Sequence, residues 1–388
     1  MTHDPYNAFV DLDPAMHGGG DGPLSGLTIG IKANIAVKGL PWTAGSAVYR
    51  NRIATEDAEV VKRLRAAGAA IPGTLNLEEA ALGAKTDNPW FGATQNPHRI
   101  GYTPGGSSGG CAAAVAAGLC DAALGTDTMG SIRIPASYCG IYGFKPANAA
   151  VSQDGLEPAE PSLDVIGPLA RNLDMLERVA RVISDFGEAE ATNGPGMILS
   201  DLGGVDCTTD VLAVYDRAKA TLGALAQSIL SVPLSRLRFA GFIKTSRAMA
   251  AHFADADSAL ISPNLASLLR YGSQRAESDW AEDERILAAV GDEIRALIWR
   301  NGILILPTAP QPAFAHSDRA PANQADFTCI ASIAGLPAIS IPAGWSADGL
   351  PIGVQLVGLT GHEAQLFGFA RALDGALAAY RPPASFQP

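Results

Sequence analysis

The chain has 388 residues, of which 47% are hydrophobic and 17% charged, and its formal net charge is −11. This composition is typical of a globular protein, and the length is sufficient to enclose a dry core in which a pKa-shifted group can work. The acidic charge opposes contact with phosphate backbones, so nucleic acid is not an expected partner. No run of 18 apolar residues occurs and residues 1–13 are polar and acidic, so neither a membrane span nor a signal peptide is predicted.

Cysteine and histidine usage indicates a reduced, metal-free protein. The five cysteines are an odd number without a C-x-x-C pair, which is typical of reduced thiols in a cytoplasmic protein. The six histidines show no metal-ligand spacing. We therefore expect a cytoplasmic protein with no metal and no cofactor.

The first part of the chain alternates short apolar strands with helices. Residues 1–23 are rich in Gly, Asp and Pro and are expected to form a loose N-terminal arm ahead of one domain, 24–388. Residues 27–31 have the composition of a buried strand that ends at Lys32, and an amphipathic helix with Thr55 as its N-cap follows. Another apolar strand comes after that helix. The alternation indicates a layered α/β core.

The middle of the chain differs in character from its two ends. Residues 184–300 carry no motif and are expected to form a variable, mainly helical region that lies over the substrate side of the sheet. The helices predicted there are 209–230, 247–271 and 281–300. Apolar, β-branched segments then return and a last helix closes the chain; these elements are 303–306, 338–341, 352–356 and 362–379.

A Gly-Ser loop at residues 105–110 runs directly into a helix of very small residues, 111–118, which we expect to be enclosed on all sides. A flexible linker would not lead into such a helix, and a phosphate-binding P-loop requires Lys where Cys111 stands. The loop does match a G-x-S-x-G nucleophile elbow, with Ser107 as nucleophile and His362 as its base. The loop alone leaves this esterase-like interpretation open.

A second serine, Ser131, lies 24 residues after Ser107 in a glycine-containing turn that follows a predicted strand. Such a turn suits a nucleophile, because its backbone N–H groups converge on one point and stabilise a tetrahedral oxyanion. Asp127 and Arg133 flank the turn with opposite charges. We expect these two side chains to brace it.

Together, the two serine motifs resemble those of the amidase signature family. The motifs are GGSSGG at 105–110 and GTDTMGSIRIP at 125–135. Other landmarks of that family occur in order along the chain, namely Gly30–Lys32, Ala44–Ser46, Asn76 with Glu79, Gly92–Pro97, Gly140–Pro146, Leu163–Pro168 and Gly335–Pro342. The resemblance covers residues 25–182 and 300–375, and it implies a single-domain, three-layer α/β/α fold with a central mixed sheet.

The resemblance also implies a Ser–Ser–Lys triad. By motif position, Ser131 is the nucleophile, Ser107 the bridging serine, which a cis peptide bond holds in this family, and Lys32 the base. The implied oxyanion hole consists of the backbone N–H groups of Thr128, Met129, Gly130 and Ser131. Ser108, Asp127 and Arg133 are expected to support the site without reacting.

Lys32 acts as a base only when it is neutral, and burial lowers the pKa of a lysine. Neutral Lys32 would take a proton from Ser107, which takes one from Ser131 as that oxygen attacks the amide carbon. The relay then returns the proton to the leaving nitrogen. This predicts an amidohydrolase that releases carboxylate and ammonia from a small carboxamide.

Three departures from the family pattern bear on the substrate. Met129 stands where many members have a second glycine, and its side chain is expected to narrow the substrate's entry while leaving the backbone N–H in place. The stretch after Pro146 lacks the Tyr-Gly-Arg sequence common in tRNA-dependent amidotransferase subunits. The shortened middle region suggests a smaller or more open acyl site, and aryl, aliphatic and urea-type amides all stay open as substrates.

Two alternative functions accompany the main prediction. One is an amidotransferase-type subunit of a larger complex, which the acidic charge and the missing Tyr-Gly-Arg stretch disfavour. The other is an α/β-hydrolase-type esterase that uses Ser107 and His362, which leaves the second serine motif unexplained. A catalytically inactive binding protein is disfavoured because all three triad positions are filled. The expected partner is a small-molecule amide, and a homodimer is left open.

Overall fold

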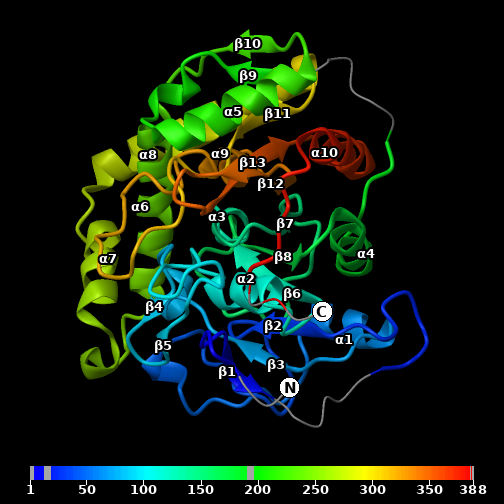
Figure 1. Cartoon of the computed structure of the whole chain (residues 1–388). Coiled ribbons are helices and arrows are strands. Elements are labelled where there is room, and N and C mark those ends of the chain that lie inside the picture. The colour runs from blue at the N-terminus through cyan, green and yellow to red at the C-terminus, as the bar shows by residue number, and fades with distance from the viewer. Residues whose placement is uncertain (1–3, 13–18, 190–195, 385, 387–388) are drawn as a thin grey trace.

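The computed structural model describes residues 4–12, 19–189, 196–384 and 386. Its centre is a mixed sheet of eleven strands that runs through the whole molecule (Figure 1). In sheet order the strands are β1 (Phe9–Leu12), β3 (Gly73–Leu75), β2 (Ile29–Lys32), β6 (Ala122–Asp127), β8 (Val165–Ala170), β7 (Tyr142–Lys145), β12 (Ala338–Trp345), β13 (Pro351–Val357), β11 (Leu304–Pro307), β9 (Met197–Leu199) and β10 (Ala226–Ser228). A separate hairpin joins β4 (Asp87–Asn88) and β5 (Gly92–Ala93).

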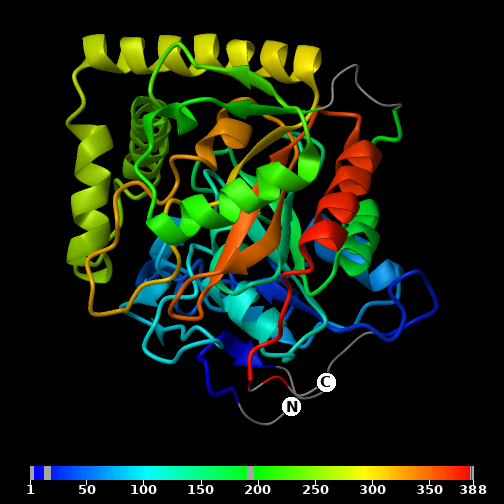
Figure 2. The same ribbon diagram turned by 45° about the horizontal axis from the view of Figure 1, so that its top comes forward.

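Helices cover both faces of this sheet, which confirms the predicted three-layer α/β/α class. One face packs against α1 (Glu59–Ala66), α4 (Leu173–Ile183), α5 (Thr209–Leu222) and α10 (Glu363–Leu377). The other face carries α2 (Gly109–Ala116), α3 (Arg133–Tyr138), α6 (Leu234–His252), α8 (Glu277–Asn301) and α9 (Cys329–Ile333). Figure 2 shows α8 along one side of the molecule, with α7 (Pro263–Ser273) beside it. Among the described helices, none combines the length and the apolar character needed to cross a membrane.

The two faces follow from the alternation of side chains along each strand. In β12, for example, Ile339 and Ile341 enter the cluster beneath α4, α5 and α10, while Ser340 points to the opposite face and contacts Thr308. Helix α2 is enclosed as predicted, since all eight of its residues are buried. A Cβ atom at Gly110 would lie 2.3 Å from the Asn76 carbonyl oxygen, so only glycine allows that approach.

The N-terminal arm predicted for residues 1–23 is wrong for part of that segment. Residues Phe9–Leu12 form the edge strand β1, which pairs antiparallel with β3. Tyr6 and Ala8 are buried. The strand is half-buried and short, so its sequence carries no alternation strong enough to reveal it. Residues 1–3 and 13–18 of the predicted arm lie outside the described residues.

The middle region differs from its prediction in two ways. It contributes strands β9 and β10 to the sheet, and its helices lie on both faces, since α5 packs with α10 while α6 and α8 pack with α9. The helix predicted over 209–230 ends at Leu222, because Gly223 adopts a φ of 73°. The helix predicted over 247–271 is two helices, because Pro263 begins α7 with Ser262 as its N-cap. Residues 190–195 lie outside the described residues.

The helix predicted from Thr55 begins later than expected. Helix α1 starts at Glu59 with Ala58 as its N-cap, and no side chain caps it. The backbone N–H groups of Val61 and Lys62 donate to the Ala58 carbonyl instead. The apolar face of the helix, with Val60, Val61 and Leu64, is buried as its periodicity predicted.

Candidate active site

Two neighbouring parallel strands bring the candidate base and the candidate nucleophile to the same edge of the sheet. Strand β2 pairs with β6 in parallel, with Ile31 opposite Leu124. Lys32 is the last residue of β2, and the Ser131 turn begins where β6 ends at Asp127. Because parallel strands end at the same edge, both groups lie together although 99 positions separate them.

Ser107 lies between these strands and helix α2. The peptide bond between Gly106 and Ser107 is cis, as the family resemblance implied. A Cβ atom at Gly106 would lie 2.8 Å from the backbone atoms of Ala84 and Lys85, so this segment needs glycine to pass so close. The Ser108 backbone N–H donates to the Ser131 carbonyl at 3.2 Å, which sets the two serine loops against each other.

Lys32 and Ser107 make direct contact inside the protein. Lys32 Nζ lies 2.8 Å from Ser107 Oγ and 2.7 Å from Thr126 Oγ1. The Lys32 side chain is fully buried. Burial lowers its pKa from 10.5 to about 8, against the opposing effect of nearby acidic groups such as Asp164. A substantial neutral fraction near neutral pH is what a general base requires.

The turn that carries Ser131 offers backbone donors around it. Gly130 has a φ of 131°, and a Cβ atom there would lie 2.2 Å from Thr328 Oγ1, so the turn requires glycine at this position. The Gly130 N–H donates to Asp127 Oδ1 at 2.6 Å and is therefore already engaged. In the described part of the chain, no protein acceptor receives the backbone N–H groups of Thr128, Met129 and Ser131.

This pattern narrows the predicted oxyanion hole. The resemblance implied four backbone donors, but the Gly130 N–H is held by the Asp127 carboxylate. The remaining donors belong to Thr128, Met129 and Ser131, and they stay in the proposal as the groups that face an oxyanion. Thr128 is fixed through its side chain, because its hydroxyl donates to Asp164 Oδ1 at 2.5 Å. Burial raises the pKa of Asp164 to about 6.

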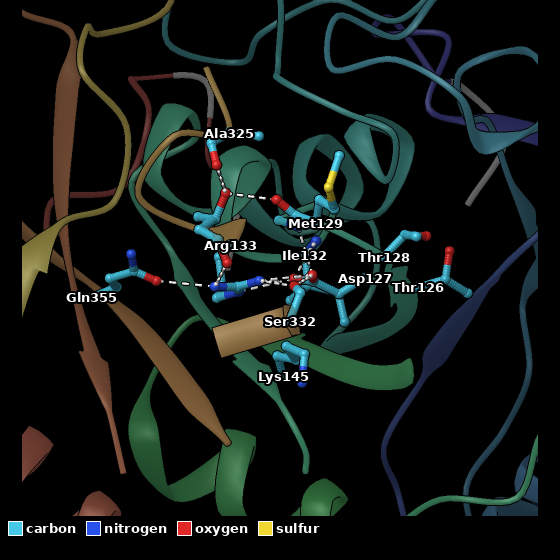
Figure 3. Close-up of polar contacts among 12 residues, drawn as sticks. Thr126, Asp127, Thr128, Met129, Ile132, Arg133, Lys145, Ala325, Ser332 and Gln355 are labelled. Atoms are coloured by element: carbon cyan, nitrogen blue, oxygen red, sulfur yellow. Dashed lines mark hydrogen bonds and ion pairs between the residues drawn. The ribbon is translucent and has the colours of Figure 1, made fainter. Parts of the chain in front are cut away.

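Asp127 and Arg133 form the expected brace beneath the turn (Figure 3). Both side chains are completely buried, and Arg133 Nη2 and Nε donate to the two Asp127 oxygens at 2.8 and 2.9 Å. Arg133 also reaches the Thr328 carbonyl, Gln355 Oε1 and Ser332 Oγ. Burial alone would raise the Asp127 pKa, but the Arg133 guanidinium outweighs it and holds that pKa below its ordinary value. Asp127 is therefore the anion that orders the turn.

Met129 extends away from the brace toward the middle region, as its side chain in Figure 3 shows. Its carbonyl accepts a hydrogen bond from Thr328 Oγ1 at 2.7 Å. Its side chain packs against α6, where an added Cβ at Gly241 would lie 2.7 Å from Met129 Sδ. Met129 thus connects the nucleophile turn to the helix that covers it.

The esterase-like interpretation of the Ser107 loop does not fit this geometry. Lys32, rather than His362, lies beside Ser107 Oγ. His362 is the N-cap residue of α10 and lines a surface pocket with Trp299 and Leu336. Ser108 is structural as expected, since its Oγ bonds both the Thr126 carbonyl and the Thr126 N–H.

Four residues close to the triad did not stand out from the sequence alone. Thr126 and Asp164 lie inside motifs that carried the resemblance, so their positions were visible but their contacts were not. Asn34, two residues after Lys32, donates to Thr126 Oγ1 at 3.3 Å. Thr328 lies in a stretch without a motif and reaches the turn only through folding. No group of three His, Cys, Asp or Glu side chains arranged for a metal ion occurs among the described residues.

Comparisons with known proteins agree with this site. The chain matches the family model described as Amidase over residues 7–197 and 199–367. A glutamyl-tRNA(Gln) amidotransferase subunit of Synechococcus sp. (strain CC9605) is 36% identical over 428 aligned residues, covering 95% of this chain and 86% of that protein. Both chains are thus matched over most of their length.

Solved structures show the same relationship. A structure described as a vestigial protein complex that reveals the origins of an s-triazine catabolic enzyme has a TM-score of 0.88 at 29% identity, covering 97% of this chain and 92% of that one. Allophanate hydrolase of Kluyveromyces lactis has a TM-score of 0.85 at 25% identity, covering 99% and 70%. The chain therefore belongs to the amidase family, whose signature motifs it carries, and it is an enzyme of amide C–N bond cleavage.

Proposed function

We propose that this enzyme hydrolyses a small carboxamide to a carboxylate and ammonia through an acyl-enzyme on Ser131. The observation that carries the proposal is the buried contact of 2.8 Å between Lys32 Nζ and Ser107 Oγ beside the Ser131 turn. A buried lysine with a lowered pKa, touching a serine in a loop that packs on a second serine, is suited to a proton relay.

In the first half-reaction, the Ser131 hydroxyl transfers its proton to Ser107 as Oγ attacks the amide carbon. Ser107 passes its own proton to the neutral Lys32 amine. The negative charge that forms on the carbonyl oxygen is held by the N–H groups of Thr128, Met129 and Ser131. The proton then returns through Ser107 to the leaving nitrogen, the C–N bond breaks, and ammonia leaves.

In the second half-reaction, water attacks the Ser131 ester. The same relay removes a proton from the water and returns it to Ser131 Oγ as the carboxylate leaves. No cofactor enters either step, because every proton moves between groups of the chain, the substrate and water.

A panel of amides tests the proposal. We expect ammonia release from at least one aryl, aliphatic or urea-type amide, with Ser131→Ala protein as the blank. Lys32→Ala should lower the rate by at least about 100-fold, since loss of a general base typically costs that much. Lys62→Ala, which removes an exposed lysine on α1, is the matched control and should retain full activity. Full activity of Lys32→Ala on a good substrate would contradict the proposal.

An ammonia-donating component of a larger assembly is the second candidate function. Its support is the 36% identity to an amidotransferase subunit over most of both chains. Under this alternative the isolated chain should release little ammonia from any amide, and the rate should rise when partner proteins are supplied. Turnover by the isolated chain that added partners leave unchanged would favour the hydrolase instead.

A further inference from the structure

The hydrogen bonds around Lys32 involve a hydroxyl that the relay itself does not use. Thr126 is 3% exposed, and its Oγ1 lies 2.7 Å from Lys32 Nζ, slightly closer than Ser107 Oγ. Asn34, 2% exposed, approaches the same hydroxyl through its side-chain amide at 3.3 Å. The backbone of Asn34 is fixed, because its carbonyl accepts from Trp42 Nε1 and from the Glu157 N–H.

The direction of the Thr126 O–H bond decides whether Lys32 can act as a base. A neutral amine has two N–H donors and one lone pair, and that lone pair must face the Ser107 proton. If Thr126 donates its proton to Nζ, the lone pair is occupied and Ser107 has no base. If Thr126 instead accepts an N–H from Lys32, the lone pair is free for Ser107.

The protonated state of the relay gives the same requirement. Once Lys32 holds the proton, all its N–H groups are donors, so the Thr126 proton needs another acceptor. Asn34 Oδ1 meets this need when the amide presents its oxygen to Thr126. The oxygen and nitrogen of an asparagine amide are assigned from the surrounding hydrogen bonds. With the nitrogen toward Thr126, Oδ1 is buried and has no partner among the described residues.

We propose that Thr126 and Asn34 are positioning residues that keep the Lys32 lone pair directed at Ser107. Asn34 Oδ1 accepts the Thr126 hydroxyl proton, and Thr126 Oγ1 accepts a Lys32 N–H in both protonation states. The remaining direction of Nζ is the one that faces Ser107. This inference rests on the proposed function, since it assigns these residues to the same relay.

The test uses a probe that reports Ser131 reactivity before the natural substrate is known. The full chain and its variants are treated with a fluorophosphonate, the labelled serine is mapped by mass spectrometry, and the labelling rate is followed against pH. We expect Thr126→Val, which keeps the shape and removes the hydroxyl, to lower the plateau rate by about tenfold. The pH midpoint of labelling should move down, because the ammonium form loses an acceptor.

The chain provides a matched control on the adjacent strand. Thr74 is fully buried in β3 opposite Ile31, and its hydroxyl has no partner among the described residues. Thr74→Val makes the same change at the same depth and should leave both the labelling rate and its midpoint unchanged. Thr126→Ser retains the hydroxyl and should restore most of the rate.

A second variant acts if Thr126→Val fails to fold. Asn34→Leu keeps the size of the side chain and removes the acceptor, so Thr126 is free to donate to Lys32. We expect the plateau rate to fall here as well. If either folded variant labels with the rate and midpoint of the parent protein, the inference is overturned. If the parent protein is not labelled at Ser131 at all, the proposed function fails first.

Discussion

Lys32 lies with its whole side chain enclosed, which sets the pH at which the relay can work. Burial lowers its pKa from 10.5 to about 8, so below that pH most molecules carry an ammonium without a lone pair. We expect the Ser131 labelling rate to fall by about tenfold per pH unit below about pH 8 and to level off above it. Rates measured at a series of pH values check this. A profile that stays flat across the same range would rule out Lys32 as the base.

Arg133 shows how much of the site depends on one buried ion pair. Its guanidinium touches Asp127, Thr328, Gln355 and Ser332, and neither partner of the Arg133–Asp127 pair has any exposed side-chain area. Arg133→Met would leave the Asp127 carboxylate buried and unpaired. We expect a loss of about 3–5 kcal/mol in the free energy of unfolding, measured by urea denaturation.

An exposed arginine serves as the control for that measurement. Arg371 on α10 pairs with Asp174 while its own side chain is 42% exposed. Arg371→Met should change the free energy of unfolding by less than about 1 kcal/mol, since exposed ion pairs contribute little. Equal losses at Arg133 and Arg371 would show that the Asp127 brace adds no stability beyond that of a surface pair.

At the scale of elements, helix α6 is the part of the middle region that contacts the nucleophile turn. Gly241 gives Met129 Sδ the space it occupies, since an added Cβ would lie 2.7 Å away. The obstructing atom is near the end of a flexible side chain, so Gly241→Ala should displace Met129 with little loss of stability. We expect the KM of an accepted amide to change by several-fold while kcat changes less.

A glycine in α10 provides the comparison. An added Cβ at Gly368 would meet no atom within 4 Å. Gly368→Ala should leave KM unchanged and stabilise the helix by about 0.5–1 kcal/mol. Met129→Ala combined with Gly241→Ala should recover the parent KM if displacement of Met129 is the cause. A KM that follows Gly241→Ala but ignores Met129 would point to another contact of α6.

The elements differ in how well the sequence predicted them. Strands β2, β6, β12 and β13 were predicted within a few residues because their apolar runs are buried on both faces. Strands β1, β9 and β10 were missed. Each has three or four residues, and each owes its conformation to a neighbour that is distant in the sequence or to a sheet edge. Such strands form because the sheet already exists, so local patterning cannot reveal them.

The same contrast holds for the site. The positions of Lys32, Ser107 and Ser131 were accessible because motif spacing fixes them along the chain, although their roles remain a proposal. The Gly130 N–H was assigned to the oxyanion hole, yet Asp127 holds it at 2.6 Å. Thr126 and Asn34 were overlooked because a hydrogen bond between residues 92 positions apart leaves no local signal.

At the scale of the whole molecule, the sheet joins the middle region to the two ends of the chain that carry the motifs. Strands β9 and β10 extend the sheet beyond β11, α5 packs with α10, and α6 and α8 pack with α9. No linker with few crossing contacts separates residues 196–301 from the rest of the described chain, so the region is built into the same core.

This arrangement predicts a single cooperative unfolding transition. As urea rises, loss of the far-ultraviolet circular dichroism signal should coincide with loss of Ser131 labelling, because the Met129 contact on α6 and the sheet cannot come apart separately. The labelling is done in short pulses at each urea concentration, and Ser131→Ala protein gives the background. Labelling that disappears at clearly lower urea than the dichroism signal would show that the helices α6–α8 detach first. In that case, the contact between α6 and the nucleophile turn would be a separable cover over an otherwise intact sheet.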